Sequence, residues 1–226
     1  MNTQNNALIE TIQSETPGTE SPNRLKPYQK VHELTGEVVN NYKYLEGHPR
    51  QYRFDAKEGV FNINGTEKVG GPSHGRTLTF QPIAWRIFTD NILNMGTKNW
   101  AEIFFIDEKN CVSAVLFHGY SVDNIFRLIE PLYYDDLTLA DVVITAIAEK
   151  KENNKIQPKG VYYIATFSYK MADVEQTKTL KQFANEVKIF RQETLTDIAN
   201  IKTAMNYYNP FANVAEETVL LPAGQV

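Results

Sequence analysis

The stretch from Trp100 to Tyr134 reads WAEIFFIDEKNCVSAVLFHGYSVDNIFRLIEPLYY and holds the clearest local patterns in the chain. Its first half is apolar, β-branched or aromatic and is interrupted by the polar turn 107–110, which predicts an antiparallel hairpin. Its second half opens with Ser121, a good helix N-cap, and continues with apolar residues at helical spacing. We therefore expect two strands followed by a helix.

Further strand-like runs lie on both sides of this unit. One precedes it at 77–91, and two follow the helix at 141–150 and 161–171. The lysine-rich connection 151–160 joins the last two runs and predicts a second hairpin. Five strands with one helix between the third and the fourth is the order of the OB-fold, a small and partly open β-barrel. The sequence therefore predicts an α+β protein built on a five-stranded OB-like β-barrel.

The remaining segments are expected to surround this barrel. Residues 1–27 are polar and rich in turn formers, which predicts a flexible N-terminal arm. Residues 28–172 then form the barrel domain with an N-terminal β extension. Residues 173–208 carry apolar side chains at three- and four-residue steps, which predicts one long C-terminal helix, and residues 209–226 form a tail.

Such a helix would be on the order of 50 Å long at ~1.5 Å per residue, which is more than a small barrel can cover. We expect its apolar stripe either to lie on its own domain or to pair with another chain as a bundle or coiled coil. The second possibility predicts a homo-oligomer. The stripe residues assigned to that contact are Leu180, Phe183, Val187, Phe190, Ile198 and Ile201.

Composition excludes several classes of protein. The chain has 226 residues, a net charge of −4 and a single cysteine, Cys111. One cysteine excludes an intramolecular disulfide and a cysteine-based zinc site. The N-terminus lacks the basic start and apolar run of a secretion signal, and no run approaches the length of a membrane-spanning helix. We therefore expect a cytoplasmic protein that does not engage a membrane.

No motif points to catalysis. The histidines are scattered without metal-ligand spacing, and no arrangement of a serine or cysteine nucleophile is present. The densest carboxylate cluster is Asp135, Asp136 and Asp141, and paired acids can bind Mg²⁺ or act as acid and base. Short polar residues after a helix end also satisfy turn backbone, so both interpretations stay open. We expect a non-enzymatic protein without a cofactor or metal.

Cations and flat side chains interleave in two parts of the predicted barrel. Single-stranded nucleic acid needs this combination, because cations neutralise phosphates and aromatic rings stack on bases. The alternative is a solvated lysine-rich turn beside a core-facing aromatic strand. The residues assigned to nucleic-acid binding are Arg76, Phe80, Trp85, Arg86, Trp100, Phe104, Lys150, Lys151, Lys155, Lys159 and Tyr162.

Two observations keep that alternative open. The net charge of −4 opposes general phosphate binding, which depends on lysine and arginine. Trp100 and Phe104 share one face of their strand, but the alternation does not show whether this face is exposed or covered.

Strand order, the basic hairpin end and the candidate aromatic residues together resemble the OB-fold single-stranded-DNA-binding proteins of phages and mobile elements. The resemblance covers about residues 76–171 and is one of topology, without a diagnostic motif. It implies non-enzymatic binding of single-stranded DNA in replication or recombination, with little sequence specificity. The acidic net charge, the abundant tyrosine and the long apolar-striped helix suit another class, a structural or assembly protein such as a virion component. Nucleic-acid binding should fall steeply with salt, whereas an apolar assembly contact should not.

Overall fold

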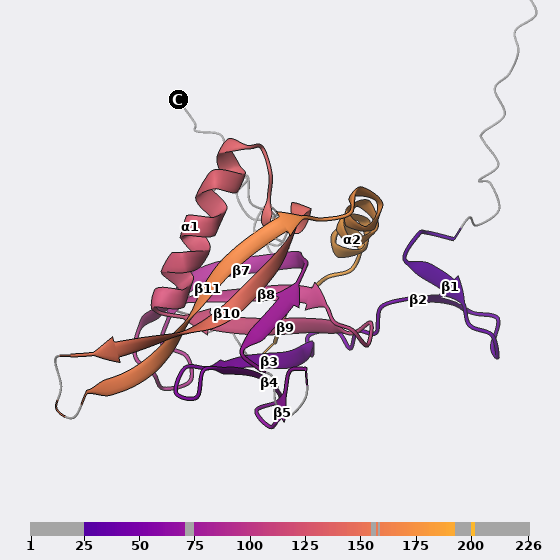
Figure 1. The fold of residues 1–226 in the computed structure, drawn as a ribbon. Helices are drawn as coiled ribbons and strands as arrows, with labels where there is room; N and C mark the ends of the chain where they lie inside the picture. The colour runs from indigo at the N-terminus through magenta and orange to yellow at the C-terminus, as the bar shows by residue number, and fades with distance from the viewer. Residues whose placement is uncertain (1–24, 71–74, 155–156, 158, 193–199, 202–226) are drawn as a thin grey trace, which may run out of the picture.

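The fold, drawn in Figure 1, comes from a computed structural model that describes residues 25–70, 75–154, 157, 159–192 and 200–201. Within this part of the chain the strands form three sheets, on which two α-helices pack, α1 (Tyr120–Tyr134) and α2 (Val174–Glu186). The protein is therefore of the α+β class, as the sequence predicts. Most of the predicted arm 1–27 and the whole tail 209–226 lie outside the described residues.

The largest sheet is mixed, and its strands in spatial order are β12 (Asn200–Ile201), β7 (Pro82–Asp90), β8 (Lys98–Ile106), β9 (Val112–His118), β3 (Arg50–Asp55), β4 (Val60–Ile63) and β5 (Glu67–Lys68). β7, β8 and β9 are consecutive antiparallel strands, which confirms the predicted hairpin around the turn 107–110. β3 adds to the outer edge of β9 in parallel, with Tyr52 opposite Val115.

The second sheet consists of β11 (Gly160–Met171), β10 (Val142–Asn153) and β6 (Thr77–Phe80), in that spatial order. β10 and β11 pair over their whole length in antiparallel register, from Val142 opposite Met171 to Asn153 opposite Gly160. The outer half of this hairpin extends beyond the rest of the molecule, toward the left of Figure 1. The hairpin that the sequence predicts is therefore present, with its tip well outside the core.

The run 77–91, predicted as one strand, forms two strands in different sheets, β6 and β7. The change of sheet occurs at Gln81, which is buried. Its side-chain amide donates to the carbonyl O of Ala140 at 2.9 Å and to Thr177 Oγ1 at 2.8 Å. These two hydrogen bonds of a buried amide fix this corner, and strand alternation alone does not reveal it.

The described strands do not close into a barrel, which corrects the expected five-stranded barrel. Closure would require the outer edge of β11 to pair with another strand, and no described strand occupies it. The outer edge of β9 is taken by β3 instead. The order of three strands, one helix and two strands is confirmed, with the first strand divided at Gln81.

Helix α1 covers one face of the central sheet and the free edge of β11. Ser121 Oγ accepts a hydrogen bond from Ala165 N at 2.9 Å, and Asn124 Nδ2 donates to the carbonyl O of Ala165 at 2.9 Å. These bonds satisfy backbone groups that an edge strand leaves open. The apolar residues of α1 recur at helical spacing and are buried, namely Val122, Ile125, Leu128, Ile129 and Leu132.

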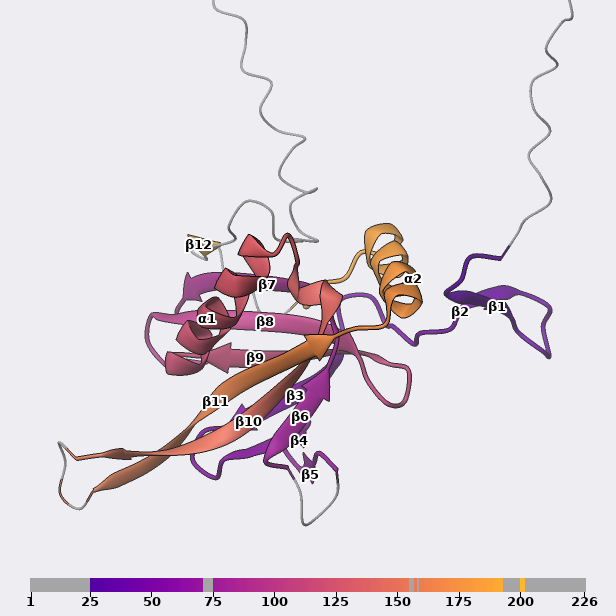
Figure 2. The same ribbon diagram turned by 45° about the horizontal axis from the view of Figure 1, so that its top comes forward.

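Both faces of the central sheet are covered, and Figures 1 and 2 show α1, β10 and β11 over one of them. On β8, Ala101 and Ile103 pack in the cluster that contains the apolar residues of α1 and β10. Phe104 lies on the opposite face, in a cluster with Phe183 of α2. The face whose exposure the sequence leaves undecided is therefore buried, like the face behind it.

The long helix predicted over 173–208 is wrong in the residues that the structure describes. α2 begins after Asp173, whose side chain accepts from Gln176 N at 2.8 Å, and it ends at Glu186. The next residue, Val187, has extended backbone with φ −111° and ψ 121°. This change of direction allows Ile189 to enter the same buried cluster as α2.

The apolar stripe assigned to an oligomer contact completes the core of its own chain. Leu180 and Phe183 are buried, and Val187 packs against the same cluster. Phe190 is half-buried, and its ring lies close to Gly47. Ile198 lies outside the described residues, and the backbone of Ile201 pairs with Phe88 of β7. The assignment of these residues to self-association is therefore corrected wherever the structure describes their side chains.

The third sheet is a small hairpin of β1 (Gln29–Val31) and β2 (Val38–Asn40). It projects from the molecule on the side away from the β10–β11 hairpin, at the right of Figures 1 and 2. We call residues 29–40 the β1–β2 arm.

Candidate nucleic-acid interface

The aromatic residues predicted to stack on bases are mostly buried. Trp85 and Trp100 are each 1% exposed, and Phe80 and Phe104 are also buried. Covering of both faces of the central sheet explains this burial, and the indole of Trp100 also donates to the carbonyl O of Asp90 at 2.9 Å. The assignment of these four side chains to a stacking surface is therefore wrong.

Arg86, predicted to contact phosphate, is also fully buried, which corrects that assignment. Its guanidinium forms an ion pair with Glu102 of β8, with Nη2 2.7 Å and Nε 2.8 Å from Glu102 Oε2. Arg191, in the segment after α2, lies 3.6 Å from the other Glu102 oxygen. This buried cluster ties the segment after α2 to the sheet.

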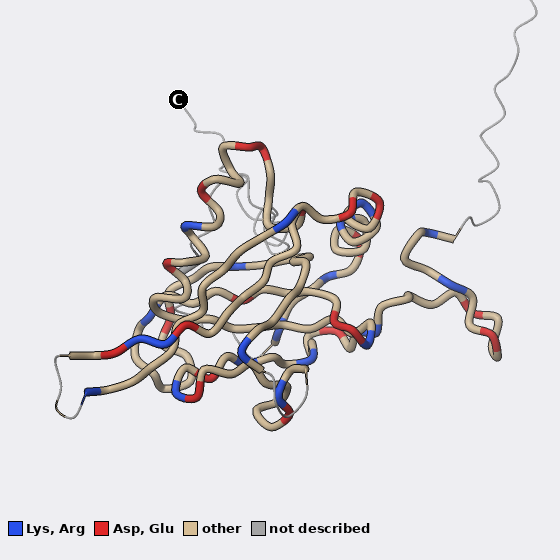
Figure 3. The backbone as a smooth tube through the Cα atoms, viewed as in Figure 1, with Lys and Arg blue, Asp and Glu red and all other residues tan. Residues whose placement is uncertain are grey.

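The other predicted binding residues lie on or beside the β10–β11 hairpin. Lys151 is directly opposite Tyr162 in the strand register, and Lys150 is opposite Tyr163. Arg76 stands beside the hairpin, with its guanidinium carbon 5.6 Å from the ring centroid of Tyr163. Figure 3 shows basic and acidic positions close together along the projecting half. Lys155 lies outside the described residues, and the accessible members of the predicted set are Arg76, Lys150, Lys151, Lys159 and Tyr162.

A groove runs between α1 and the solvent-facing side of this hairpin. Its middle is a hollow of about 360 Å³, lined from the helix by Tyr120 and Arg127 and from the hairpin by Lys151 and Tyr162. The hydrogen bonds from the helix to Ala165 hold its two walls together. We call the surface formed by Tyr120, Arg127, Lys151 and Tyr162 the α1 groove.

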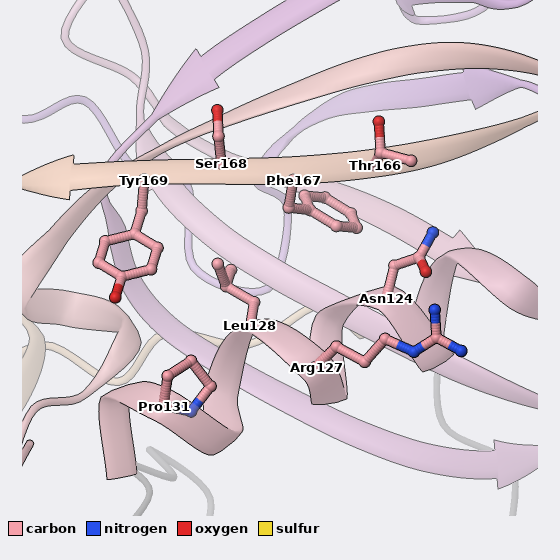
Figure 4. A pocket seen from close by; sticks show the side chains of 8 residues that line it. All are labelled: Asn124, Arg127, Leu128, Pro131, Thr166, Phe167, Ser168 and Tyr169. Carbon is pink, nitrogen blue, oxygen red and sulfur yellow. The ribbon is translucent and has the colours of Figure 1, made fainter. Parts of the chain in front are cut away.

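The hollow continues at both ends. Toward the start of α1, a second hollow shares Tyr120 and adds Thr97, from the end of the β7–β8 connection, and Lys98, the first residue of β8. Toward the end of α1, a third hollow shares Asn124 and Arg127 with the α1 groove (Figure 4). The α1 groove is therefore the middle of a longer surface depression.

Exposed rings and cations occur together in the α1 groove. Tyr120 is 67% exposed, and none of the ion pairs between described residues involves Arg127. Acids are present as well, because Asp123 and Glu149 also line the hollow. Lys151 Nζ lies 2.5 Å from Glu149 Oε1. A half-exposed pair of this kind contributes only about 0.2–1 kcal/mol, so a phosphate can replace the carboxylate.

His118 lies beneath this surface, in a hollow that Tyr120 and Tyr162 also line. Burial, assisted by the positive charge of Lys98, lowers the pKa of His118 below its ordinary value. The shift favours the uncharged imidazole. Its ring packs edge-on against Trp100, on the face of β8 and β9 away from α1, so it does not enter the α1 groove.

Sequence reasoning missed Tyr120 and Arg127. Both occupy polar positions of the amphipathic helix α1, where exposed side chains are expected in any case. The available signal was a large aromatic residue on a polar face at the start of the helix. The sequence does not show that this face turns toward Lys151 and Tyr162.

The carboxylates Asp135, Asp136 and Asp141 do not gather into a metal-ligand group in the part of the chain that the structure describes. Asp141 Oδ2 accepts from Thr138 N at 2.9 Å, and Asp141 Oδ1 lies 2.6 Å from Lys181 Nζ. Burial favours the neutral acid, but the contacts to Lys181 and Thr138 outweigh it and lower the pKa of Asp141. This carboxylate therefore joins α2 to the turn before β10.

Comparison of the chain with models of protein families, with curated proteins and with solved structures finds no match. Among the described helices, none is long and apolar enough to span a bilayer. Function must therefore be inferred from the geometry of the α1 groove.

Proposed function

We propose that this chain binds single-stranded DNA without catalysis and that the α1 groove is the binding surface. The observation that carries the proposal is the placement of Tyr120 and Tyr162 in one groove with Arg127 and Lys151. Rings beside cations suit the bases and phosphates of a single strand. The proposal excludes a duplex as the preferred ligand, because its base faces are already stacked on one another.

The position of the groove within the fold supports the proposal. In OB-folds, the loop between the first two strands and the loop between the last two commonly frame the ligand. The depression here runs from Thr97 and Lys98, at the end of the first of these connections and the start of β8, to Lys151 and Tyr162 near the second. We interpret the fold as an opened OB-like arrangement in which β3 occupies the edge of β9.

The charge distribution predicts how such binding depends on salt. With a net charge of −4, the molecule as a whole does not attract a polyanion such as DNA. Binding of DNA must therefore depend on a few local cations and on stacking. Contacts from Lys98, Arg127 and Lys151 to three phosphates would give a slope of about −2 for log affinity against log salt. Stacking on each tyrosine would contribute about 1–3 kcal/mol and would be insensitive to salt and to base identity. We assign this binding to replication or recombination, where single strands are exposed.

The proposal is tested by fluorescence anisotropy with a labelled single-stranded oligonucleotide at several salt concentrations. The double variant Tyr120→Ala, Tyr162→Ala should bind at least about tenfold more weakly, because both stacking rings are removed. Lys151→Glu should lower the affinity and also reduce the salt slope by about 1.

Matched controls lie on the same helix and on a distant turn. Tyr134 is 76% exposed at the end of α1 and outside the groove, and Lys109 is exposed in the β8–β9 turn. Tyr134→Ala and Lys109→Glu should bind like the unaltered protein. Equal affinities in the groove variants and these controls would contradict the proposal, as would absence of binding at low salt.

One observation favours the second candidate, a structural or assembly protein. Leu34, at the tip of the β1–β2 arm, is 92% exposed. An exposed apolar side chain on a projecting hairpin suits contact with another protein surface. The two candidates differ in salt dependence, because an apolar contact is not weakened by added salt.

A further inference from the structure

The β1–β2 arm is held firmly at its base. Tyr28 is buried, and its ring lies 5.4 Å from that of Phe183 in α2 in an edge-on arrangement. Lys26 and Tyr28 both contact the carboxylate of Glu186, and their hydrogen bonds lower the pKa of Glu186 to about 2. On the other side, Lys43 N donates to the carbonyl O of Asn110, and its own carbonyl O accepts from Val112 N at the start of β9. The arm therefore leaves the molecule from a fixed point.

The outer part of the arm exposes apolar side chains. Val31, Leu34 and Val38 are 50%, 92% and 46% exposed. The turn itself is ordered, because the His32 and Glu37 backbones are hydrogen-bonded at 2.8 Å. An isolated two-stranded hairpin is marginally stable in water, so an apolar arm of this kind is stabilised when another surface covers it. Glu33 and Glu37 give the tip two negative charges beside Leu34, visible in red at the right of Figure 3.

The third hollow has the complementary chemistry. It measures about 420 Å³ and lies between α1 and β11. Figure 4 shows Tyr169 pointing toward Pro131 and Leu128 standing between the helix and the strand. Arg127 is the one charged residue among its described lining residues. A leucine flanked by acids therefore matches an apolar hollow with a guanidinium at its rim.

The backbone of β11 adds a second complementary feature beside this hollow. Ala165 N points to the free edge of the strand, where it meets Ser121. Two residues further on, Phe167 points its backbone groups to the same edge, where no described strand pairs with it. The open edge of a hairpin such as the β1–β2 arm can form hydrogen bonds there.

We propose that the β1–β2 arm of one copy docks in the third hollow of a second copy, with Leu34 inside it and Glu33 or Glu37 beside Arg127. The arm lies on the opposite side of the molecule in Figure 1 from α1 and β11, whose residues line the third hollow, so one copy does not fill its own hollow. The contact joins two different surfaces and repeats head to tail, which builds an open chain of copies. The contact does not depend on nucleic acid. It shares Arg127 with the end of the α1 groove and leaves Tyr120, Lys151 and Tyr162 open, so it places successive grooves in a row.

Cysteine cross-linking tests the contact directly. Cys111 is replaced by serine in two variants, one carrying Leu34→Cys and the other Ser168→Cys, since Ser168 lines the third hollow and is exposed. Mild oxidation of an equal mixture should give a disulfide-linked dimer that contains one copy of each variant. Each variant alone should give much less dimer. Dimers of Leu34→Cys with itself at the same yield would overturn the proposal.

Sedimentation velocity without DNA provides the second measurement, with a matched pair of leucines. Leu34→Asp should weaken self-association at least about tenfold. Leu45 is 72% exposed outside the arm, and Leu45→Asp should sediment like the unaltered protein. Equal behaviour of the two variants, or an unaltered protein that stays monomeric at all concentrations, would overturn the proposal.

DNA binding is tested separately from self-association with an oligonucleotide so short that only one copy of the protein can bind it. Leu34→Asp should bind this short strand with unaltered affinity and should lose cooperativity only on a long strand. Normal self-association without DNA binding would contradict the proposed function alone. DNA binding by a protein that never self-associates would contradict the head-to-tail contact alone.

Discussion

At the scale of single residues, Asp107 organises the turn between β8 and β9. Its Oδ1 accepts from the backbone N–H groups of Lys109 and Cys111, both at 2.9 Å. Its Oδ2 accepts from Arg50 Nη1 at 2.9 Å and from Ser113 Oγ at 3.0 Å. Because Arg50 belongs to β3, this one carboxylate joins the turn to the strand that pairs in parallel with β9.

We predict that Asp107→Asn lowers the free energy of unfolding by about 3 kcal/mol at pH 7, because it removes the buried carboxylate from Arg50 and leaves only the longer contact to Glu67 at 4.0 Å. Burial favours the neutral acid, but hydrogen bonds from Cys111, Arg50 and Lys109 outweigh it and lower the pKa of Asp107. A lowered folded-state pKa stabilises the fold above the unfolded value of about 4, and this contribution disappears as the pH falls through the folded value. Urea unfolding between pH 7 and pH 2 should therefore show that the free energy of unfolding decreases less with falling pH in the variant than in the unaltered protein. An equal decrease in the free energy of unfolding in both proteins would contradict this role of the Asp107 carboxylate.

Single residues of β8 also show that the alternation of side chains along a strand predicts which residues share a face, but not whether that face is covered. The pattern correctly places Trp100, Glu102 and Phe104 on one face of β8. It does not show that α2 and the segment after it cover this face. Glu102 between two aromatic residues was the available signal, because an acid on a buried face needs a cation such as Arg86 opposite it.

At the scale of elements, α1 takes the place of a further strand along β11. Ser121 and Asn124 satisfy the N–H and the C=O of Ala165, which faces the open edge. This arrangement positions the two walls of the α1 groove relative to each other. The stability of the groove therefore depends on two polar side chains of one helical turn.

Ser121→Ala should lower the free energy of unfolding by about 1–3 kcal/mol, because it leaves the buried N–H of Ala165 without an acceptor. Hydrogen exchange should show faster exchange of the Ala165 amide than in the unaltered protein. Thr138→Ala removes a hydroxyl at a turn away from this edge and serves as the comparison. Unchanged exchange at Ala165 would show that α1 does not close the edge of β11.

The length of an element was predictable where the sequence pattern fits only one kind of element, and not where it fits both a helix and an extended segment. The strands β8 to β11 and helix α1 fall close to the predicted runs. The helix predicted over 173–208 fails after Glu186, because an extended segment also buries residues such as Val187 and Ile189. Apolar spacing over a few residues does not separate these two cases.

At the scale of the whole molecule, the features that define the surface come from contacts far apart in the sequence. β3 pairs in parallel with β9, and this pairing leaves the outer edge of β11 to α1. Parallel pairing between such distant segments has no local sequence signal. For the same reason, the sequence suggested nucleic-acid binding through Trp100 and Phe104 as well as Tyr162, whereas the rings that line the α1 groove are Tyr120 and Tyr162.

Photo-cross-linking maps the site most directly. A single-stranded oligonucleotide carrying 5-iodouracil is irradiated in complex with the unaltered protein, and the cross-linked peptides are identified by mass spectrometry. Iodouracil reacts with aromatic side chains in contact with the base, so we expect cross-links at Tyr120 and Tyr162, and their loss in the presence of excess unlabelled single strand. Cross-links confined to exposed tyrosines outside the α1 groove, such as Tyr134, would contradict the proposal that this groove binds the single strand.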